Sequence, residues 1–171
     1  AAFADTTPMT ALEDRELLAG APKVFAKNQL VIVTEPGNPE DITGLADLAT
    51  AGVITLCVDT APCGKFADQI LDDAGVTIPG TSVSRGTDAR ATLTAVSEGD
   101  AVAAIVYATD ATAAGDRVEA VDLPAAGNVT ASYPIAVLED AANPDLAAAF
   151  RSYVLSEDGQ TVLRDAGFLA P

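Results

Sequence analysis

Residues 53–71, VITLCVDTAPCGKFADQIL, decide the fold, because they join an apolar strand to an amphipathic helix through a short turn. The β-branched run at the start is typical of a strand. Pro62 suits the entry to a helix, since its missing N–H would have no partner in the first turn. Phe66 and Ile70 recur at helical spacing, and Gly75 is the expected helix end. Such a strand–turn–helix unit favours an α/β protein.

The same alternation of strands and helices continues on both sides of this unit. The nearly all-apolar run AVAAIVYA at 101–108 is typical of a buried central strand. Alternating elements predict a sheet with right-handed crossovers, whose ligands bind beyond the carboxyl ends of the strands. Further strands are expected at 29–35, 82–85, 117–123 and 128–138, and helices at 9–20, 42–52, 88–96, 145–155 and 157–167.

The composition excludes several classes of function. The 171 residues include no histidine, which removes Ser-His-Asp and Cys-His catalysis and histidine zinc sites. The net charge of −16 argues against nucleic acid and anionic membranes, because both need basic patches. No Asp/Glu cluster has the spacing of a calcium loop, so no direct cation site is expected. No apolar run is long enough to span a bilayer, and the opening residues do not resemble a signal peptide.

The turn before the helix at 64–74 is the first candidate site. The amides of Cys63, Gly64 and Lys65 would be free donors, directed past the end of the strand. Gly64 would leave room for a ligand to approach the backbone closely. The helix dipole adds to these amides, and together they form an anion site. The alternative is an ordinary turn whose amides are capped by Thr60 or by water.

The segment GTDARATL at 86–93 is the second candidate site. Thr87 or Asp88 can cap the helix, which leaves the amides of Ala89 and Arg90 free. The Arg90 side chain would either pair with an anion or lie in solvent, and a simple capped helix is the alternative for the whole segment. Both helices would begin at the same edge of the sheet.

Tyr107, in VYATDA at 106–111, is the third candidate and ends the most buried strand. Its hydroxyl could donate to a ligand, or it could belong to a core tyrosine bonded to a backbone carbonyl. All the candidate ligand groups are neutral donors. An oxyanion can bind an acidic protein in this way, because local dipoles replace its hydration shell without a counter-charge.

The two cysteines, Cys57 and Cys63, lie on either side of the strand-to-helix turn. Their Cβ atoms could approach disulfide distance, and the bond would stabilise the fold by roughly 2 kcal/mol through chain entropy. A disulfide implies an oxidising, extracytoplasmic setting. A redox pair or a thiolate metal site is the rival interpretation, although the spacing is not C-x-x-C and no third ligand is near.

Three motifs carry a resemblance to a known family: P-x-G-x-[FY]-A at 62–67, IVY-x-[TS]-DA at 105–111 and YP-[IV]-AV at 133–137. With them, the chain resembles periplasmic molybdate-binding proteins of ABC transporters, the ModA family, along essentially its whole length. The spacing V-C-x(5)-C-G is similar to that of actinobacterial members. The other matching segments are AFADTTPM, FAKNQLVIVTEPGNP, ITGLADL, APCGKFADQIL, DARATLTAV, AAIVYATDA, YPIAVLEDAANPDLAAAF and a GF near the end.

The resemblance implies the two-lobed type II periplasmic-binding-protein fold, an α/β fold with mixed or parallel sheets. Lobe two would comprise residues 27–123, and residues 1–26 and 124–171 would form the remainder of lobe one. The chain begins at a segment similar to the family's FASAD, with Phe3 at its serine, so lobe one is expected to be incomplete. Full affinity is therefore expected only of a longer chain.

The family's ligand groups carry over by motif. They are the backbone amides of Cys63 and Ala89 and the hydroxyl of Tyr107, supported by Pro62, Gly64, Asp88 and Arg90. The family's other two ligands are serines in an AAASL-type turn and a following S-S segment, and this sequence has neither.

The resemblance implies a binding protein and not an enzyme. It would capture molybdate, or tungstate, for an ABC permease without any cofactor. The protein would be an extracytoplasmic monomer, either free or lipid-anchored. The alternatives are a receptor for sulfate, phosphate or another oxyanion, and the effector-sensing domain of a transcription regulator. An enzyme is a third alternative, in which only Asp88, Arg90 or Tyr107 could act.

Overall fold

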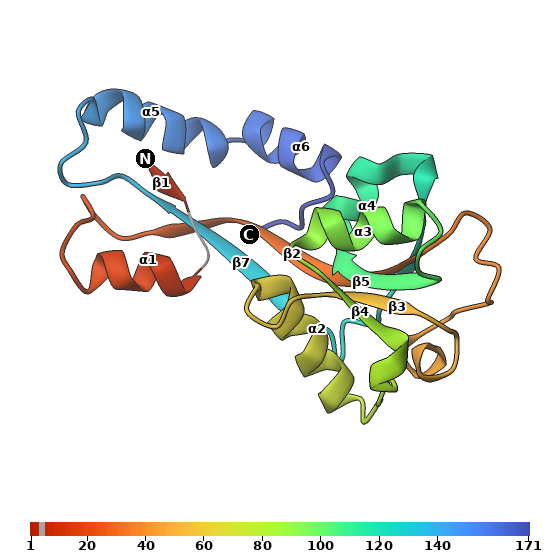
Figure 1. The fold of residues 1–171 in the computed structure, drawn as a ribbon. Helices are drawn as coiled ribbons and strands as arrows, with labels where there is room; N and C mark the ends of the chain where they lie inside the picture. Colours follow the sequence, from red (N-terminus) through yellow and green to blue (C-terminus); the bar gives the residue numbers. More distant parts are fainter. Residues whose placement is uncertain (4–5) are drawn as a thin grey trace. The chain divides into compact units, whose positions relative to one another are not determined.

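The computed structural model describes residues 1–3 and 6–171, and the chain divides into two compact units (Figure 1). Unit 1 comprises residues 1–28 and 130–171, and unit 2 comprises residues 29–129. The long strand β2, Lys23–Thr34, passes from the first unit into the second. The chain is thus a mixed α/β structure, as the alternating pattern predicted.

The sheet of unit 2 is mixed. Strands β4 (Val83–Gly86), β3 (Ile54–Cys57) and β5 (Ala103–Tyr107) lie side by side and run parallel. The end of β2 pairs antiparallel with β5, and also with β6 (Glu119–Asp122). A mixed sheet agrees with the expected fold class.

The helices of unit 2 connect these strands. Helix α2 (Pro62–Asp73) follows β3, α3 (Ala89–Ser97) follows β4, and α4 (Ala108–Ala114) follows β5. The short 3₁₀ helices η1 (Leu45–Ala49), η2 (Gly80–Ser82) and η3 (Gly115–Arg117) complete the connections. Two apolar clusters share the sheet, one around Ile32, Ile54 and Ile105 and the other around Val33 and Val106.

Unit 1 is built on the first part of β2. Strand β7 (Thr130–Ala136) lies next to β2 in the strand order, and β1 (Ala2–Phe3) pairs antiparallel with β7. Its helices are α1 (Thr6–Glu13), α5 (Pro144–Val154) and α6 (Glu157–Asp165). Met9 and Ile135 are buried, whereas Leu146 of α5 is 70% exposed.

Two expected helices are shorter than the sequence pattern indicated. The helix expected at 9–20 ends at Glu13, because Glu16 takes a left-handed conformation (φ 56°) and its amide bonds back to the Glu13 carbonyl at 2.9 Å. The amide of Leu17 donates to the Leu12 carbonyl at 3.0 Å, which completes a helix-ending motif usually built on glycine. The segment expected as a helix at 42–52 contains only η1.

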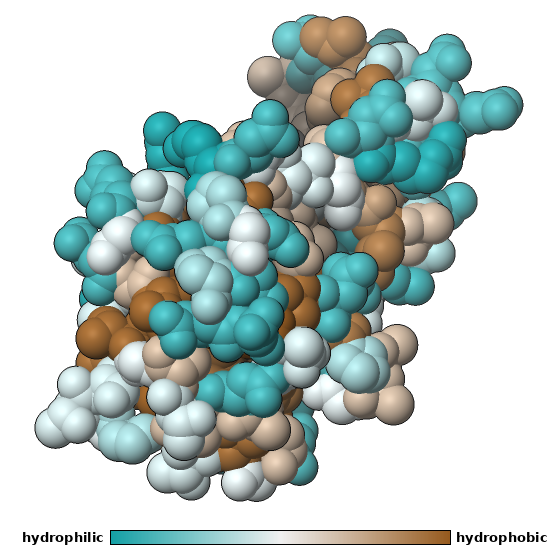
Figure 2. Space-filling view, turned by 90° about the vertical axis from the view of Figure 1, so that its right-hand side faces the viewer, coloured by the Kyte–Doolittle hydropathy of each residue, from teal (hydrophilic) through white to brown (hydrophobic). Residues whose placement is uncertain are grey.

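Other boundaries agree with the expectations. Gly75, at φ 66°, follows the end of α2 as expected, and the apolar run at 101–108 contains β5. Hydrophilic residues cover most of the face drawn in Figure 2, with apolar residues in small groups between them, in keeping with the strongly acidic composition. Among the described residues, no helix combines the length and the apolar character needed to cross a membrane.

Candidate oxyanion site

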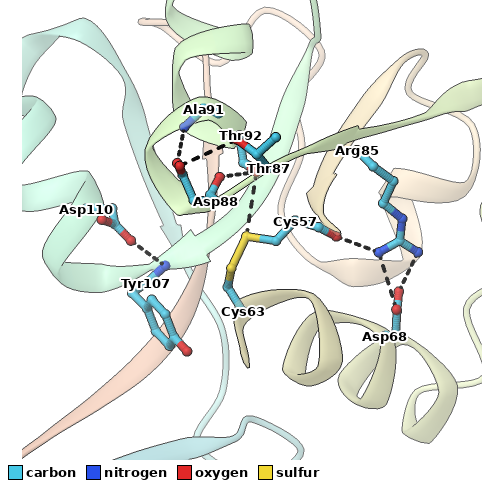
Figure 3. Close-up of a disulfide and its surroundings, with 10 residues drawn as sticks. All are labelled: Cys57, Cys63, Asp68, Arg85, Thr87, Asp88, Ala91, Thr92, Tyr107 and Asp110. Carbon is cyan, nitrogen blue, oxygen red and sulfur yellow. Dashed lines mark hydrogen bonds and ion pairs between the residues drawn. A yellow bond between two sulfur atoms is a disulfide. The ribbon is translucent and has the colours of Figure 1, made fainter. Parts of the chain in front are cut away.

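The three parallel strands of unit 2 end at one edge of the sheet, and a helix begins just beyond each end. Cys57 lies opposite Gly86 in the register, and the Val58 amide donates to the Gly86 carbonyl at 2.8 Å, which ties the ends of β3 and β4 together. This edge is where an α/β sheet binds its ligands. It carries the sequence-predicted ligand residues Cys63, Ala89 and Tyr107 (Figure 3).

At the start of α2, one of the three expected amides is left as a donor. The amides of Gly64 and Lys65 both donate to the Ala61 carbonyl, at 3.1 Å each. No side chain caps this end, so the expected alternative of a cap by Thr60 is not found. The Cys63 amide has no acceptor among the residues that the structure describes. The expectation of free donors at Gly64 and Lys65 is corrected, because the first turn closes tightly on Ala61.

Gly64 is required by packing inside the protein. A Cβ atom on Gly64 would lie 2.8 Å from the carbonyl oxygen of Cys57 and even closer to the carbonyl of Val58. The start of α2 therefore rests directly on the end of β3. The space that the sequence analysis reserved for a ligand is occupied by this backbone.

The predicted disulfide between Cys57 and Cys63 is present, with 5.8 Å between the Cα atoms (Figure 3). Both cysteines are buried, and the Thr92 hydroxyl of α3 donates to the Cys57 sulfur at 3.6 Å. The bond joins the end of β3 to the first turn of α2, so it fixes the Cys63 amide in place. Within the described part of the chain, no group of three or more Cys, Asp or Glu side chains could hold a metal ion.

The start of α3 follows the expected pattern. Asp88 is the N-cap, and its carboxylate accepts from the Ala91 amide at 2.8 Å. Its carbonyl accepts from the Thr92 amide at 3.0 Å. Over the residues the structure describes, the amides of Ala89 and Arg90 have no acceptor. They are thus available to a ligand at this edge of the sheet.

Tyr107 is the last residue of β5 and is half-buried. Its amide donates to the Asp110 carboxylate at 3.3 Å, which closes the turn into α4. In Figure 3 the tyrosine ring points away from that carboxylate.

The Asp110 carboxyl of α4 is affected by the negative charge of Asp88 at the start of α3. Burial raises its pKa above the ordinary value, the hydrogen bond from the Tyr107 amide lowers it, and the negative charge of Asp88 raises it further. The balance is a raised pKa. Asp88 caps α3 and Asp110 belongs to α4, so the negative charges of these two helix starts disfavour one another.

Three side chains that hold this edge together were not predicted from the sequence, namely Arg85, Thr92 and Asp110. Arg85 of β4 donates to the Cys57 carbonyl at 2.8 Å and forms an ion pair with Asp68 of α2 at 2.8 Å. Thr92 reaches the disulfide, as described above. Arg90, by contrast, is exposed and lines a cavity of about 420 Å³ with Asp110. Only Asp110 carried a local signal, since an acidic residue three positions after a helix cap is a capping-box pattern.

Comparisons with known proteins identify this arrangement as a type II solute-binding fold. The periplasmic molybdate-binding protein of Azotobacter vinelandii superposes with a TM-score of 0.82 at 19% identity, covering 99% of this chain and 77% of that protein. The sulfate-binding protein SubI of Mycobacterium tuberculosis superposes with a TM-score of 0.77 at 21% identity, covering 98% of this chain and 67% of that one. At these identities the likeness establishes the fold alone.

Sequence relatives give a more specific result. Proteins named molybdate-binding protein ModA from Mycobacterium bovis and Mycobacterium tuberculosis are each 36% identical over 171 residues, or 99% of this chain. A family model described as bacterial extracellular solute-binding protein matches residues 1–169. The chain belongs to this family, which is one of transport binding proteins and not of enzymes. It spans 65% of the length of the curated relatives.

Proposed function

We propose that the chain is part of an extracytoplasmic receptor that captures molybdate, and tungstate as a near-isostere, for an ABC permease. The observation that carries the proposal is the meeting of three strand ends at one edge of unit 2. There, Cys63 lies in the first turn of α2, Ala89 is the first residue of α3 and Tyr107 precedes α4. Among the residues that the structure describes, the amides of Cys63 and Ala89 have no acceptor. The name of the 36% identical mycobacterial relatives supports molybdate as the solute.

The proposed ligand groups are neutral hydrogen-bond donors, which can bind an anion in a protein whose net charge is negative. Helix starts carry partial positive charge, and α2 and α3 direct theirs toward the edge without adding a cationic side chain. A dianion that leaves water needs hydrogen-bond donors, and backbone amides fixed by a disulfide and a capped helix are rigid donors. Selection against sulfate would come from the size of the cage, since both anions carry the same charge.

The two compact units would be the two lobes of the receptor. In this proposal unit 2 holds the three donors named above, and unit 1 belongs to the other lobe.

Amide NMR tests the proposal residue by residue, even if binding to this chain is weak. Molybdate and tungstate, titrated into the ¹⁵N-labelled chain, should shift the amide signals of Cys63, Ala89 and Arg90 more than those of α5 and α6. Sulfate and phosphate at equal concentration and ionic strength should shift them less. Equal shifts with sulfate would favour a receptor for another oxyanion, and no shift with any anion would overturn the proposal.

A proline substitution isolates one backbone donor. Ala89 is the first residue of α3 and follows an extended Asp88, so Ala89→Pro removes the amide N–H at a position that accepts proline. Affinity for molybdate should fall by roughly 1.5–3 kcal/mol, the value of a hydrogen bond to a charged group. Glu157→Pro, at the first position of α6, is the matched control and should leave affinity unchanged. Equal affinities for Ala89→Pro and the unmodified chain would remove Ala89 from the site.

A further inference from the structure

The Asp110 carboxylate contributes a hydrogen bond to the turn that carries Tyr107. The Tyr107 amide donates to the Asp110 carboxylate, and Asp110 is the third residue of α4. The Asp110 carboxylate therefore closes the turn by which the chain leaves β5 at Tyr107.

Burial and the charge of Asp88 both disfavour the anionic form of the same carboxyl. It is half-buried, and the charge of Asp88 on the neighbouring helix start acts on it. Asp110 also lines a cavity of about 420 Å³, whose charged residues are of both signs, Arg90, Glu98 and Arg117. The two carboxylates, Asp88 and Asp110, flank the helix starts that would receive a dianion.

We propose that Asp110 is the positioning residue of the oxyanion site, holding Tyr107 in place at the cost of a repulsive charge beside the anion. This inference rests on the proposed function, because it assigns to Asp110 a role in the same site. Position and charge have opposite effects on affinity, and substitutions can separate them.

Two substitutions of Asp110 separate its positioning role from the effect of its charge. Asp110→Asn keeps an oxygen that can accept from the Tyr107 amide and removes the charge. Asp110→Ala removes both the acceptor and the charge. The difference between these two variants measures positioning, and the difference between Asp110→Asn and the unmodified chain measures charge. Glu98→Gln removes a charge from the same cavity without touching Tyr107, and it is the matched control.

Molybdate titrations of the four proteins give the first result. Asp110→Asn should bind molybdate about two- to fivefold more tightly at low salt, and the gain should shrink as salt screens the charge. Asp110→Ala should bind about three- to tenfold more weakly than Asp110→Asn, the range expected for one lost hydrogen bond. Glu98→Gln should stay within about twofold of the unmodified chain, since exposed charges act weakly. Equal affinities for the Asn and Ala variants would overturn the positioning role.

Hydrogen exchange without any ligand separates this inference from the proposed function. The Tyr107 amide should exchange about tenfold faster in Asp110→Ala, because its acceptor is gone, and at an unchanged rate in Asp110→Asn. If exchange responds in this way but no protein binds molybdate, the proposed function fails and the role of Asp110 reduces to holding a turn. If molybdate binds and exchange of Tyr107 is the same in all four proteins, the positioning role fails alone.

Discussion

Unit 2 and unit 1 share the strand β2, yet they bury their apolar side chains to very different extents. Most of the largest fully buried side chains belong to unit 2, among them Leu30, Ile54 and Ile105. In unit 1, Leu146 and Val162 are 70% and 60% exposed. A helical stripe of apolar residues therefore predicts a helix in both units, but it does not predict what covers the stripe. Unit 2 should accordingly carry most of the stability that this chain has by itself.

The largest expected effect on the free energy of unfolding comes from truncating a buried aliphatic side chain in unit 2, compared with an exposed one in unit 1. Ile105→Ala in unit 2 should lower the free energy of unfolding by about 2–5 kcal/mol, because Ile105 of β5 is fully buried in one of the apolar clusters of that unit. Leu146→Ala in unit 1 should change it by less than about 0.5 kcal/mol. Urea denaturation followed by circular dichroism measures both. Equal losses would show that unit 1 is packed as firmly as unit 2.

Gly64→Ala tests the contact between β3 and α2. The added methyl would collide with the carbonyls of Cys57 and Val58, and the free energy of unfolding should fall by about 3 kcal/mol, the upper end for overpacking. Gly80→Ala is the control, because a Cβ there meets nothing within 4 Å. Thermal unfolding of the two variants compares them. If Gly64→Ala were as stable as the unmodified chain, the glycine would not be required by packing, and the interpretation that it leaves room for a ligand would be favoured.

Removing a hydroxyl from each unit distinguishes the proposed site from the remaining surface. Tyr107→Phe should weaken molybdate binding by about 1–3 kcal/mol, the cost of a lost hydrogen bond to the anion. Tyr153→Phe, on the 52% exposed side chain in α5, should leave affinity unchanged. Calorimetric titration at fixed salt measures both. A similar loss in the two variants would point to a general surface effect.

The smallest expected effect concerns the ion pair between Asp68 and Arg85. Both side chains are 36% exposed, so Asp68→Asn should lower the free energy of unfolding by only about 0.2–1 kcal/mol, and less at high salt. The hydrogen bond from Arg85 to the Cys57 carbonyl would remain. Chemical denaturation at two salt concentrations tests this, and a loss above about 2 kcal/mol would mean that the pair holds the strand ends together.

The fold was predictable where the decisive chemistry is local. Asp88 as a helix cap, Gly75 as a helix end and the Cys57–Cys63 bond all follow from residues close together in the sequence. The end of α1 was missed because Glu16, and not a glycine, adopts the left-handed conformation there. Sequence periodicity does not reveal such a choice.

The candidate site was predictable only in part. The starts of α2 and α3 follow from strand–turn–helix patterns, whereas α4, which begins just after Tyr107, was not expected. The contact that explains Gly64 is with the backbone of a neighbouring strand, and Arg85 reaches Cys57 from β4. Such contacts depend on how strands pair, which the sequence pattern does not fix. The roles of Cys63, Ala89 and Tyr107 as ligands stay predictions until an anion is bound.

The disulfide has a consequence for how the polypeptide is made. Its cysteines are 6 positions apart, and the chain contains only these two. A single intramolecular pairing exists, so oxidation within this chain cannot produce a mispaired isomer. Closing so short a loop takes on the order of 10–100 ns, far less time than adding one residue at the ribosome. Bringing the two cysteines together is therefore not the slow step, and the oxidation itself, which takes seconds to hours depending on the oxidant, sets when the bond forms.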